Sequence, residues 1–249
     1  MDFFDGNCFI GLPARAIPRP AETAADLIAA MDRSDIRRAL VWHVAQRDYA
    51  APVGNDLLAQ AIAPHAERLV GCWTLLPPQT DELPPPEEFL AAMQRANVRA
   101  LRAFPTFHNY LLRQESGGAL LELMVARRVP LIMSPGALDW TGIYNLLRDF
   151  PELVCVLTDL GLWGADRWFR PLVENYPGVH VEIGQYVLAG GIPSFVRKYG
   201  ASRLLFGTGF PDWDHGGMML TLRHADISEK DKQAIAAGNL ERLLAAAAL

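Results

Sequence analysis

The sequence lacks the features that mark membrane proteins and nucleic-acid-binding proteins. No stretch approaches the roughly 20 apolar residues of a membrane-spanning helix, and the acidic residues 1–5 are unlike the start of a signal peptide. Lys and Arg (23 together) are fewer than Asp and Glu (28) and are scattered along the chain, whereas binding to phosphate backbones needs a basic stripe. We therefore expect neither a membrane nor a nucleic-acid partner.

Cysteine is scarce as well. The 249 residues include three cysteines, which are Cys8, Cys72 and Cys155. Each lies within an apolar run, and none belongs to a Cys-x-x-Cys pair. A sparse, odd number of buried cysteines is typical of reduced thiols, so the sequence predicts a cytoplasmic protein without disulfides.

What the sequence does contain is a regular alternation of apolar strands and helix-patterned segments. About half of the residues are hydrophobic (51%) and a fifth are charged (20%), which indicates a large core. Eight runs rich in β-branched and aromatic residues predict strands: Phe3–Ile10, Arg38–His43, Val70–Leu75, Val98–Phe104, Pro130–Ser134, Leu153–Thr158, Val179–Ile183 and Arg203–Thr208. Several are apolar throughout, which is typical of parallel strands buried on both faces.

The segments between these strands have helical spacing of their apolar residues, and the last helix is predicted to begin at Ser228, with Asp231 completing a weak capping box. The proline-rich stretch 77–86 is interpreted as the loop after the third strand, because the alternation resumes directly after it. Eight strand–helix units in this length favour a single closed (β/α)8 barrel covering residues 1–249 over an open sheet.

Five motifs, in the right order along the chain, resemble those of the amidohydrolase superfamily. Residues 4–11 (FDGNCFIG) resemble its first-strand motif Ile-Asp-x-His-x-His-x-Gly, and residues 98–105 (VRALRAFP) resemble its fourth strand. Residues 157–161 (LTDLG) resemble the sixth-strand segment, 206–211 (FGTGFP) the eighth-strand Phe-Gly-Ser-Asp-Tyr-Pro, and 238–243 (GNLERL) the closing Gly-Asn-x-x-Arg-Leu. The resemblance implies a TIM barrel of the metal-dependent hydrolase type, acting as a hydrolase or decarboxylase.

The positions that bind metal in that superfamily are mostly substituted here. The two first-strand histidine positions hold Asn7 and Phe9, and the eighth-strand aspartate position holds Gly209. The fifth-strand histidine position matches Ser134, and the sixth-strand position matches Asp159. A catalytic zinc site needs about three strong protein ligands, and the inherited positions supply one. We therefore predict no metal at the inherited site.

The remaining polar residues near predicted strand ends form a candidate site, because the active site of such a barrel lies at the carboxyl ends of its strands. We predict Asp159, His43 and His108 as acid–base groups, and Arg102 as the group that binds a substrate carboxylate through its planar fork. Other predicted substrate-binding residues are Asp5, Asn7, Ser134, Asp212 and His215. Trp140, Trp163 and Trp213 follow strand ends and could form an aromatic wall.

Three interpretations remain open from the residues. The first is an enzyme without metal or other cofactor, acting on a small carboxylated molecule. The second is a barrel that binds a ligand without catalysis, or a pure interaction protein if Phe9 and Phe210 fill the mouth. The third is one divalent metal at a relocated site, built from Asp212, Asp214 and His215 with His43, His108 or Asp159. The resemblance also implies a possible homodimer.

Overall fold

The computed structural model of the chain describes residues 1–161 and 164–249. Its strands lie in one eight-stranded sheet in chain order, and each pairs in parallel with the next. They are β1 (Phe3–Ile10), β2 (Ile36–His43), β3 (Leu69–Thr74), β4 (Val98–Arg102), β5 (Leu131–Met133), β6 (Cys155–Leu157), β7 (Val179–Glu182) and β8 (Leu204–Leu205). The sheet curls into a nearly closed barrel, which confirms the predicted (β/α)8 architecture.

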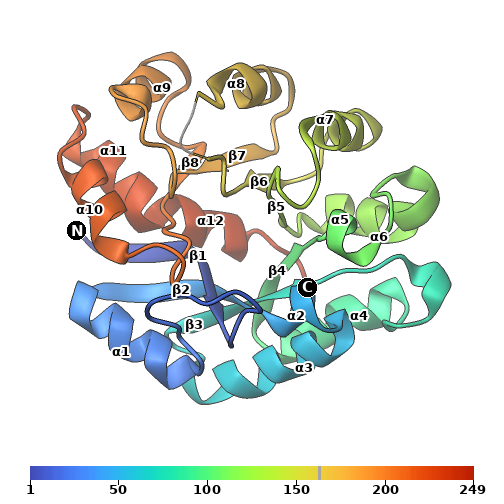
Figure 1. The fold of residues 1–249 in the computed structure, drawn as a ribbon. Helices are drawn as coiled ribbons and strands as arrows, with labels where there is room; N and C mark the ends of the chain where they lie inside the picture. The colour runs from blue at the N-terminus through green and yellow to red at the C-terminus, as the bar shows by residue number, and fades with distance from the viewer. Residues whose placement is uncertain (162–163) are drawn as a thin grey trace.

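Helices follow the strands and surround the barrel (Figure 1). The longer ones are α1 (Ala24–Ser34), α3 (Ala51–Ile62), α4 (Pro86–Arg95), α6 (Gln114–Arg127), α7 (Trp140–Asp149), α8 (Asp166–Asn175), α9 (Gly191–Tyr199) and α10 (His215–Arg223). Two four-residue helices, α2 (Ala45–Asp48) and α5 (Pro105–His108), lie in the loops after β2 and β4. The short helix α11 (Glu229–Gln233) begins after Ser228, whose hydroxyl accepts a hydrogen bond from the Asp231 amide as predicted. A π-helical turn (Ala234–Gly238) then leads into α12 (Asn239–Ala245).

The barrel closes where β1 meets the segment that follows β8. The Gly6 amide donates to the Phe206 carbonyl, and the Gly209 amide donates to the Asn7 carbonyl, both at 2.9 Å. β8 itself is only two residues long, although the sequence predicted a strand over Arg203–Thr208. The difference arises because β1 is irregular opposite this segment, so the hydrogen bonds there do not form a regular ladder.

The irregularity is a bulge in β1. Asp5 pairs with Ala39 and Cys8 pairs with Val41, so three steps along β1 match two steps along β2. In a regular strand Asp5 and Cys8 would point to opposite faces of the sheet. The extra residue places Asp5 and Cys8 on the same face of the sheet. This face points toward the helices, because Cys8, Ala39 and Val41 all belong to the outer core.

The core has two layers. The larger lies between the sheet and the helices, and the smaller fills the barrel interior with side chains such as Phe4, Val70 and Val156. Leu240 and Leu244 of α12 belong to the interior layer, so α12 covers the amino-terminal end of the barrel. This leaves the carboxyl ends of the strands as the open end.

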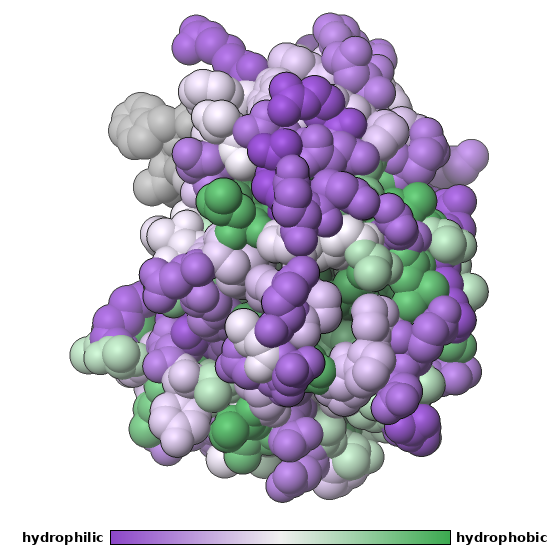
Figure 2. Space-filling view, turned by 90° about the vertical axis from the view of Figure 1, so that its right-hand side faces the viewer, coloured by the Kyte–Doolittle hydropathy of each residue, from purple (hydrophilic) through white to green (hydrophobic). Residues whose placement is uncertain are grey.

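The side of the molecule shown in Figure 2 is mainly polar. Figure 2 shows one side of the molecule on which hydrophilic side chains predominate and hydrophobic ones form separate groups. Within residues 1–161 and 164–249, none of the helices has the length and apolar character needed to cross a membrane.

Candidate functional site

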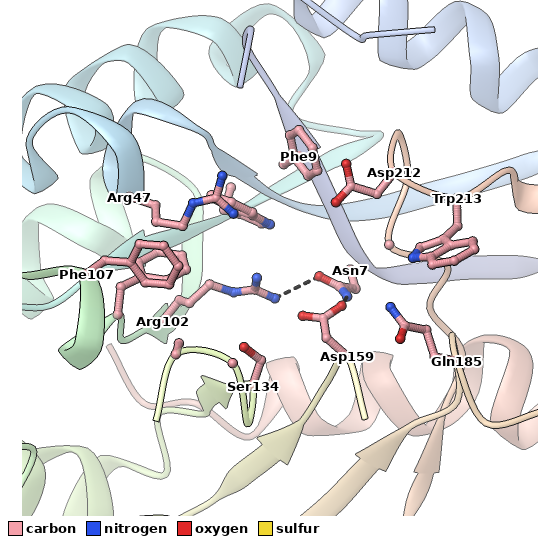
Figure 3. Close-up of a pocket in the computed structure, with 15 residues that line it drawn as sticks. Asn7, Phe9, Arg47, Arg102, Phe107, Ser134, Asp159, Gln185, Asp212 and Trp213 are labelled. Atoms are coloured by element: carbon pink, nitrogen blue, oxygen red, sulfur yellow. Dashed lines mark hydrogen bonds between the residues drawn. The ribbon is translucent and has the colours of Figure 1, made fainter. Parts of the chain in front are cut away.

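The open end of the barrel holds a cavity of about 230 Å³ (Figure 3). Its lining combines two arginines, two aspartates, neutral polar groups and five aromatic rings. The lining residues are Asn7, Phe9, Trp42, Arg47, Arg102, Phe104, Phe107, Ser134, Gly136, Ala137, Asp159, Gln185, Gly209, Asp212 and Trp213. Five of the predicted site residues are therefore brought together here, and Phe9 does not fill the mouth.

A chain of hydrogen bonds crosses the floor of this cavity through Asn7. The Arg102 guanidinium donates to Asn7 Oδ1 at 2.8 Å, and Asn7 Nδ2 donates to Asp159 Oδ1 at 2.9 Å. The bond from Arg102 fixes which side of the amide is the oxygen, so the NH2 group must face the carboxylates. Asn7 thereby holds a cation and an anion at opposite sides of one amide, as Figure 3 shows.

Asp159 follows β6 in a left-handed backbone conformation with φ of 53°. Aspartate tolerates this conformation better than most residues. Its second carboxylate oxygen accepts a hydrogen bond from the Thr158 hydroxyl at 3.0 Å. Both oxygens are thus oriented by neighbours, and the carboxylate lines the cavity.

Glu182, at the end of β7, is a buried carboxyl group that the sequence reasoning missed. It accepts a hydrogen bond from Asn7 Nδ2 at 3.4 Å and another from the Gly184 amide. Burial raises the pKa of Glu182 to about 8, and the charges of Asp159 and Asp5 act in the same direction. The sequence feature that could have indicated Glu182 is its position as the one acidic residue of β7, at the carboxyl end of the strand. The site lies at this end of the barrel.

Asp212 comes from the loop after β8 and lines the opposite side of the cavity from Arg102 (Figure 3). Burial raises the pKa of Asp212 above its usual value, and its ion pair with Arg15 opposes part of that rise. The carboxyl group of Asp212 is therefore more readily protonated than an ordinary aspartate, which suits a proton donor.

Aromatic rings form the wall next to Arg102. The Trp42 ring lies 5.1 Å from Phe9 and 5.2 Å from Phe104, measured between ring centroids. The Arg102 guanidinium carbon lies 5.0 Å from the centroid of Trp42, and this cation–π contact orients the guanidinium further. Arg47 of α2 contacts the Trp42 ring at 5.5 Å and also lines the cavity.

Of the three tryptophans predicted at a wall, Trp213 lines the cavity. Trp140 instead stacks on Trp168 with ring centroids 5.8 Å apart, outside this cavity. Trp163 lies outside the described residues. Four other lining residues were not among the predicted site residues, because their positions depend on loop conformation and strand register: Trp42, Arg47, Phe107 and Gln185.

The histidines lie elsewhere. His43 turns its Nδ1 back to the Ala45 amide at 3.1 Å, and His108 contacts the Arg47 carbonyl through Nε2 at 3.3 Å. Neither residue lines the cavity, and burial lowers the pKa of both rings. Of the three residues predicted as acid–base groups, Asp159 lines the cavity, whereas His43 and His108 do not.

Asp5 and His215, which were predicted to bind substrate, also lie outside this cavity. The β1 bulge turns Asp5 to the helix-facing side, where its carboxylate accepts hydrogen bonds from the Thr208 amide and hydroxyl at 3.0 and 2.5 Å. His215, the first residue of α10, lies on the same side, with its Nε2 3.9 Å from Asp5 Oδ2.

The side chains at the inherited metal positions do not fit a metal ion. The Asn7 amide presents its donor group to Asp159, in the direction where a cation would have to bind. Gly209, at the position of the metal-binding aspartate of the superfamily motif, has φ of +75° and no side chain. A Cβ built on it would lie 3.9 Å from both Asn7 Nδ2 and Asp159 Oδ1. The glycine therefore removes a carboxylate ligand from beside these two groups. With Phe9 and Ser134 at two further positions, Asp159 is the one strong zinc ligand among these inherited positions.

The residues of the alternative, relocated metal site are not gathered around one point either. Asp212 pairs with Arg15, and Asp214 caps α10 through the Gly216 amide. His215 turns away toward Asp5. Within the described part of the chain, one group of acidic, cysteine and histidine side chains lies close enough together to bind a metal ion. This group is Asp5, Cys8 and His215.

Comparisons with known proteins agree with this architecture. The family model for amidohydrolases matches residues 7–245. The chain belongs to the amidohydrolase family. No curated protein matches this amidohydrolase with a significant score.

Solved structures resemble the amidohydrolase over nearly its whole length. An uncharacterised TIM-barrel protein of Bordetella bronchiseptica has a TM-score of 0.74 and 18% identity, with 99% of each chain covered. The 2,6-dihydroxybenzoate decarboxylase of Rhizobium has a TM-score of 0.72 and 15% identity, with 98% of each chain covered. A probable 2-pyrone-4,6-dicarboxylic acid hydrolase of Acinetobacter baumannii has a TM-score of 0.70 and 12% identity, covering 98% of this chain and 100% of its own. At these identities the likeness shows the shared fold.

Proposed function

We propose that this amidohydrolase hydrolyses a small aromatic carboxylic acid ester, lactone or amide without a metal in its pocket. The observation that carries the proposal is the Arg102–Asn7–Asp159 chain beneath an aromatic wall. The guanidinium would bind the substrate carboxylate, and the rings would contact the faces of a single-ring molecule. The relatives named as acting on dihydroxybenzoate and on pyrone dicarboxylate support this substrate class.

Hydrolysis is favoured over decarboxylation by the arginine. A carboxylate bound to Arg102 is stabilised as an anion, which opposes its loss as neutral CO2. The same contact suits a substrate whose carboxylate is an anchor and whose reacting bond lies further along the pocket. Decarboxylation remains the second reaction for a substrate bound in the opposite direction, with its carboxylate beside Asp159.

Two aspartates supply the acid–base chemistry. Asp159 takes a proton from a water molecule, whose oxygen forms a bond to the substrate carbonyl carbon. Asp212 donates a proton to the leaving oxygen or nitrogen as its bond to that carbon breaks, because its raised pKa keeps it protonated to higher pH. Ser134 donates a hydrogen bond to the substrate.

The first experiment measures turnover of a panel of aromatic carboxylate esters, lactones and amides after treatment with a chelator. Arg102→Lys should raise KM at least about tenfold, because a lysine cannot make the paired contact. Arg38→Lys is the matched control, since its guanidinium also lies over an aromatic ring, Phe4, but at the closed end of the barrel. Equal kinetics for the two variants would contradict the assigned anchor.

Asp159→Asn and Asp212→Asn should each lower kcat by about 10²–10⁴-fold, the usual contribution of a general acid or base. Asp214→Asn is the control, because Asp214 is exposed and asparagine caps a helix equally well.

If every member of the panel binds in calorimetry and none turns over, the second candidate, a ligand-binding barrel without catalysis, replaces the first. This alternative is favoured by one feature: both Asp159 oxygens already accept protein hydrogen bonds.

We further infer that the protein works in the cytoplasm and pairs as a homodimer. The free thiols of Cys8, Cys72 and Cys155 support a reducing compartment. Sedimentation of the purified protein tests the dimer.

A further inference from the structure

The seam of the barrel holds a second group of polar side chains, separate from the pocket. Asp5 and Cys8 come from β1 and His215 begins α10, and one ligand atom from each lies within 4.8 Å of the others. All three residues are buried, with at most 1% of their surface exposed. The β1 bulge is the reason that Asp5 and Cys8, three residues apart, share a face.

His215 presents an unpartnered nitrogen to this group. Its Nε2 is buried without a hydrogen-bond partner and lies 3.9 Å from Asp5 Oδ2. The ring is fixed by Nδ1, which lies 3.2 Å from the Ser34 hydroxyl, and by stacking on Phe210 at 4.2 Å between centroids. A metal-binding histidine is oriented in this way, with one nitrogen held by a neighbour and the other free for the ion.

The carboxylate of Asp5 is oriented as firmly. Oδ1 accepts from the amides of Asn7 and Thr208, and Oδ2 accepts from the Thr208 hydroxyl while facing His215. Within the described residues, His215 is the one basic side chain within 4.0 Å of this fully buried carboxylate, and its ring is a cation only when protonated. A buried carboxylate without a cation is costly.

We propose that Asp5, Cys8 and His215 bind one zinc ion that links β1 to the start of α10. A thiolate, an imidazole and a carboxylate are all zinc ligands. One thiolate and one carboxylate balance the charge of a divalent ion, so binding it removes the unpaired buried charge. Zinc bonds of about 2.0–2.3 Å place ligand atoms roughly 3.3–3.8 Å apart, so small side-chain movements from the present positions suffice.

The ion has a structural role in this place. The site lies on the helix-facing side of the sheet, whereas the Arg102–Asn7–Asp159 chain faces the barrel interior. It joins the first strand to the helix that follows the last strand, where the ladder is irregular. The inference does not rest on the proposed hydrolase activity.

The test begins with elemental mass spectrometry of protein purified without a histidine tag or chelator. We expect about one zinc per chain in the wild type and in Cys155→Ser, and loss of zinc in Cys8→Ser and His215→Gln. Cys155 is the matched control because it is an equally buried thiol in the same core layer. Zinc-free wild type that also takes up no zinc on refolding with it would overturn the proposal, as would full retention of zinc by Cys8→Ser.

Cobalt replacement provides a readout that does not depend on the variants folding. Wild-type protein refolded with Co(II) should show a thiolate-to-cobalt charge-transfer band, which marks a bond from Cys8 to the ion. Absence of the thiolate band would exclude Cys8 as a ligand.

Metal lost from Asp159→Asn but kept by Cys8→Ser would place the ion in the pocket, which overturns both this site and the metal-free pocket. A seam zinc in a protein that hydrolyses nothing in the panel would leave this site standing and overturn the proposed activity alone.

Discussion

At the scale of single residues, the amide of Asn7 joins the two charged groups on which the proposed chemistry of the pocket rests. It accepts from Arg102 and donates to Asp159, so it connects opposite charges at the position where the superfamily motif has a metal-binding histidine. The motif comparison predicted that a ligand was lost here. It did not predict the replacement contact, because the partner lies on β4, almost a hundred residues away in the chain.

Glu182 gives a prediction about stability and pH. Its pKa is raised from 4.5 to about 8 in the folded protein, so between these values the folded state binds a proton that the unfolded state has released. Stability from this group therefore falls as pH rises through that window. Glu182→Gln removes the effect, so the variant should gain free energy of unfolding relative to the wild type between pH 4.5 and 8, by at most about 5 kcal/mol.

Urea unfolding of both proteins at the two ends of this pH range measures the difference. Glu122→Gln serves as the control, because Glu122 is exposed and bonded to Gln114 on the surface. An unchanged difference between Glu182→Gln and the wild type across the range would mean that Glu182 ionises normally.

Gly209 gives a second prediction at this scale. Its φ of +75° is strained for any residue with a Cβ, and that Cβ would lie 3.1 Å from the Trp213 ring. Gly209→Ala should therefore lower the free energy of unfolding by about 1–2 kcal/mol. Gly136→Ala, in the same pocket, meets nothing closer than 3.9 Å and should be nearly neutral in thermal unfolding; equal losses in both would refute the conformational argument.

At the scale of elements, the sequence predicted which segments are strands and helices but not how β1 is shaped. Alternation along a strand correctly placed Asn7 and Phe9 on one face, and both line the cavity. The same rule would place Asp5 on that face too, but the bulge shifts the alternation by one residue and turns Asp5 to the other side. A bulge arises from pairing with β2 and with the segment after β8, and a local pattern does not contain that information.

Helix α7 allows a test of an element end. Its N-cap is Asp139, whose Oδ1 accepts a hydrogen bond from the Gly142 amide at 2.7 Å. Asp139→Ala should lower the free energy of unfolding by about 1 kcal/mol, whereas Asp139→Asn should change it by a few tenths. Chemical denaturation compares the two, and an equal loss in both variants would show that the charge, rather than the cap, stabilises the helix.

At the scale of the whole molecule, the barrel was predictable because eight apolar strands alternate with helices, and parallel strands joined in this way lie in chain order. The pocket was predictable in place but only partly in composition. Arg47 comes from the short helix α2 after β2, and His43 turns back to Ala45. Such details depend on loop conformation, which a strand–helix pattern leaves open.

The cover that α12 forms over the closed end should matter to the whole fold. Leu240 is buried in the barrel interior, so Leu240→Ala should lower the free energy of unfolding by about 2–5 kcal/mol through the cavity it leaves. Leu220→Ala, whose side chain is 56% exposed, should change it by less than about 0.5 kcal/mol. Thermal unfolding distinguishes them, and a loss below 1 kcal/mol for Leu240→Ala would mean that α12 contributes little to the core.

The position of α12 also has a consequence for biosynthesis. The interior face of β1, including Phe4, is covered by a helix that is synthesised after all eight strands. Until that helix emerges, the apolar inner surface of a nearly complete barrel stays exposed to other chains, and contacts this distant in sequence form slowly. The nascent protein therefore exposes apolar surface until α12 has emerged, and its yield in cells should depend on chaperones that bind it before then.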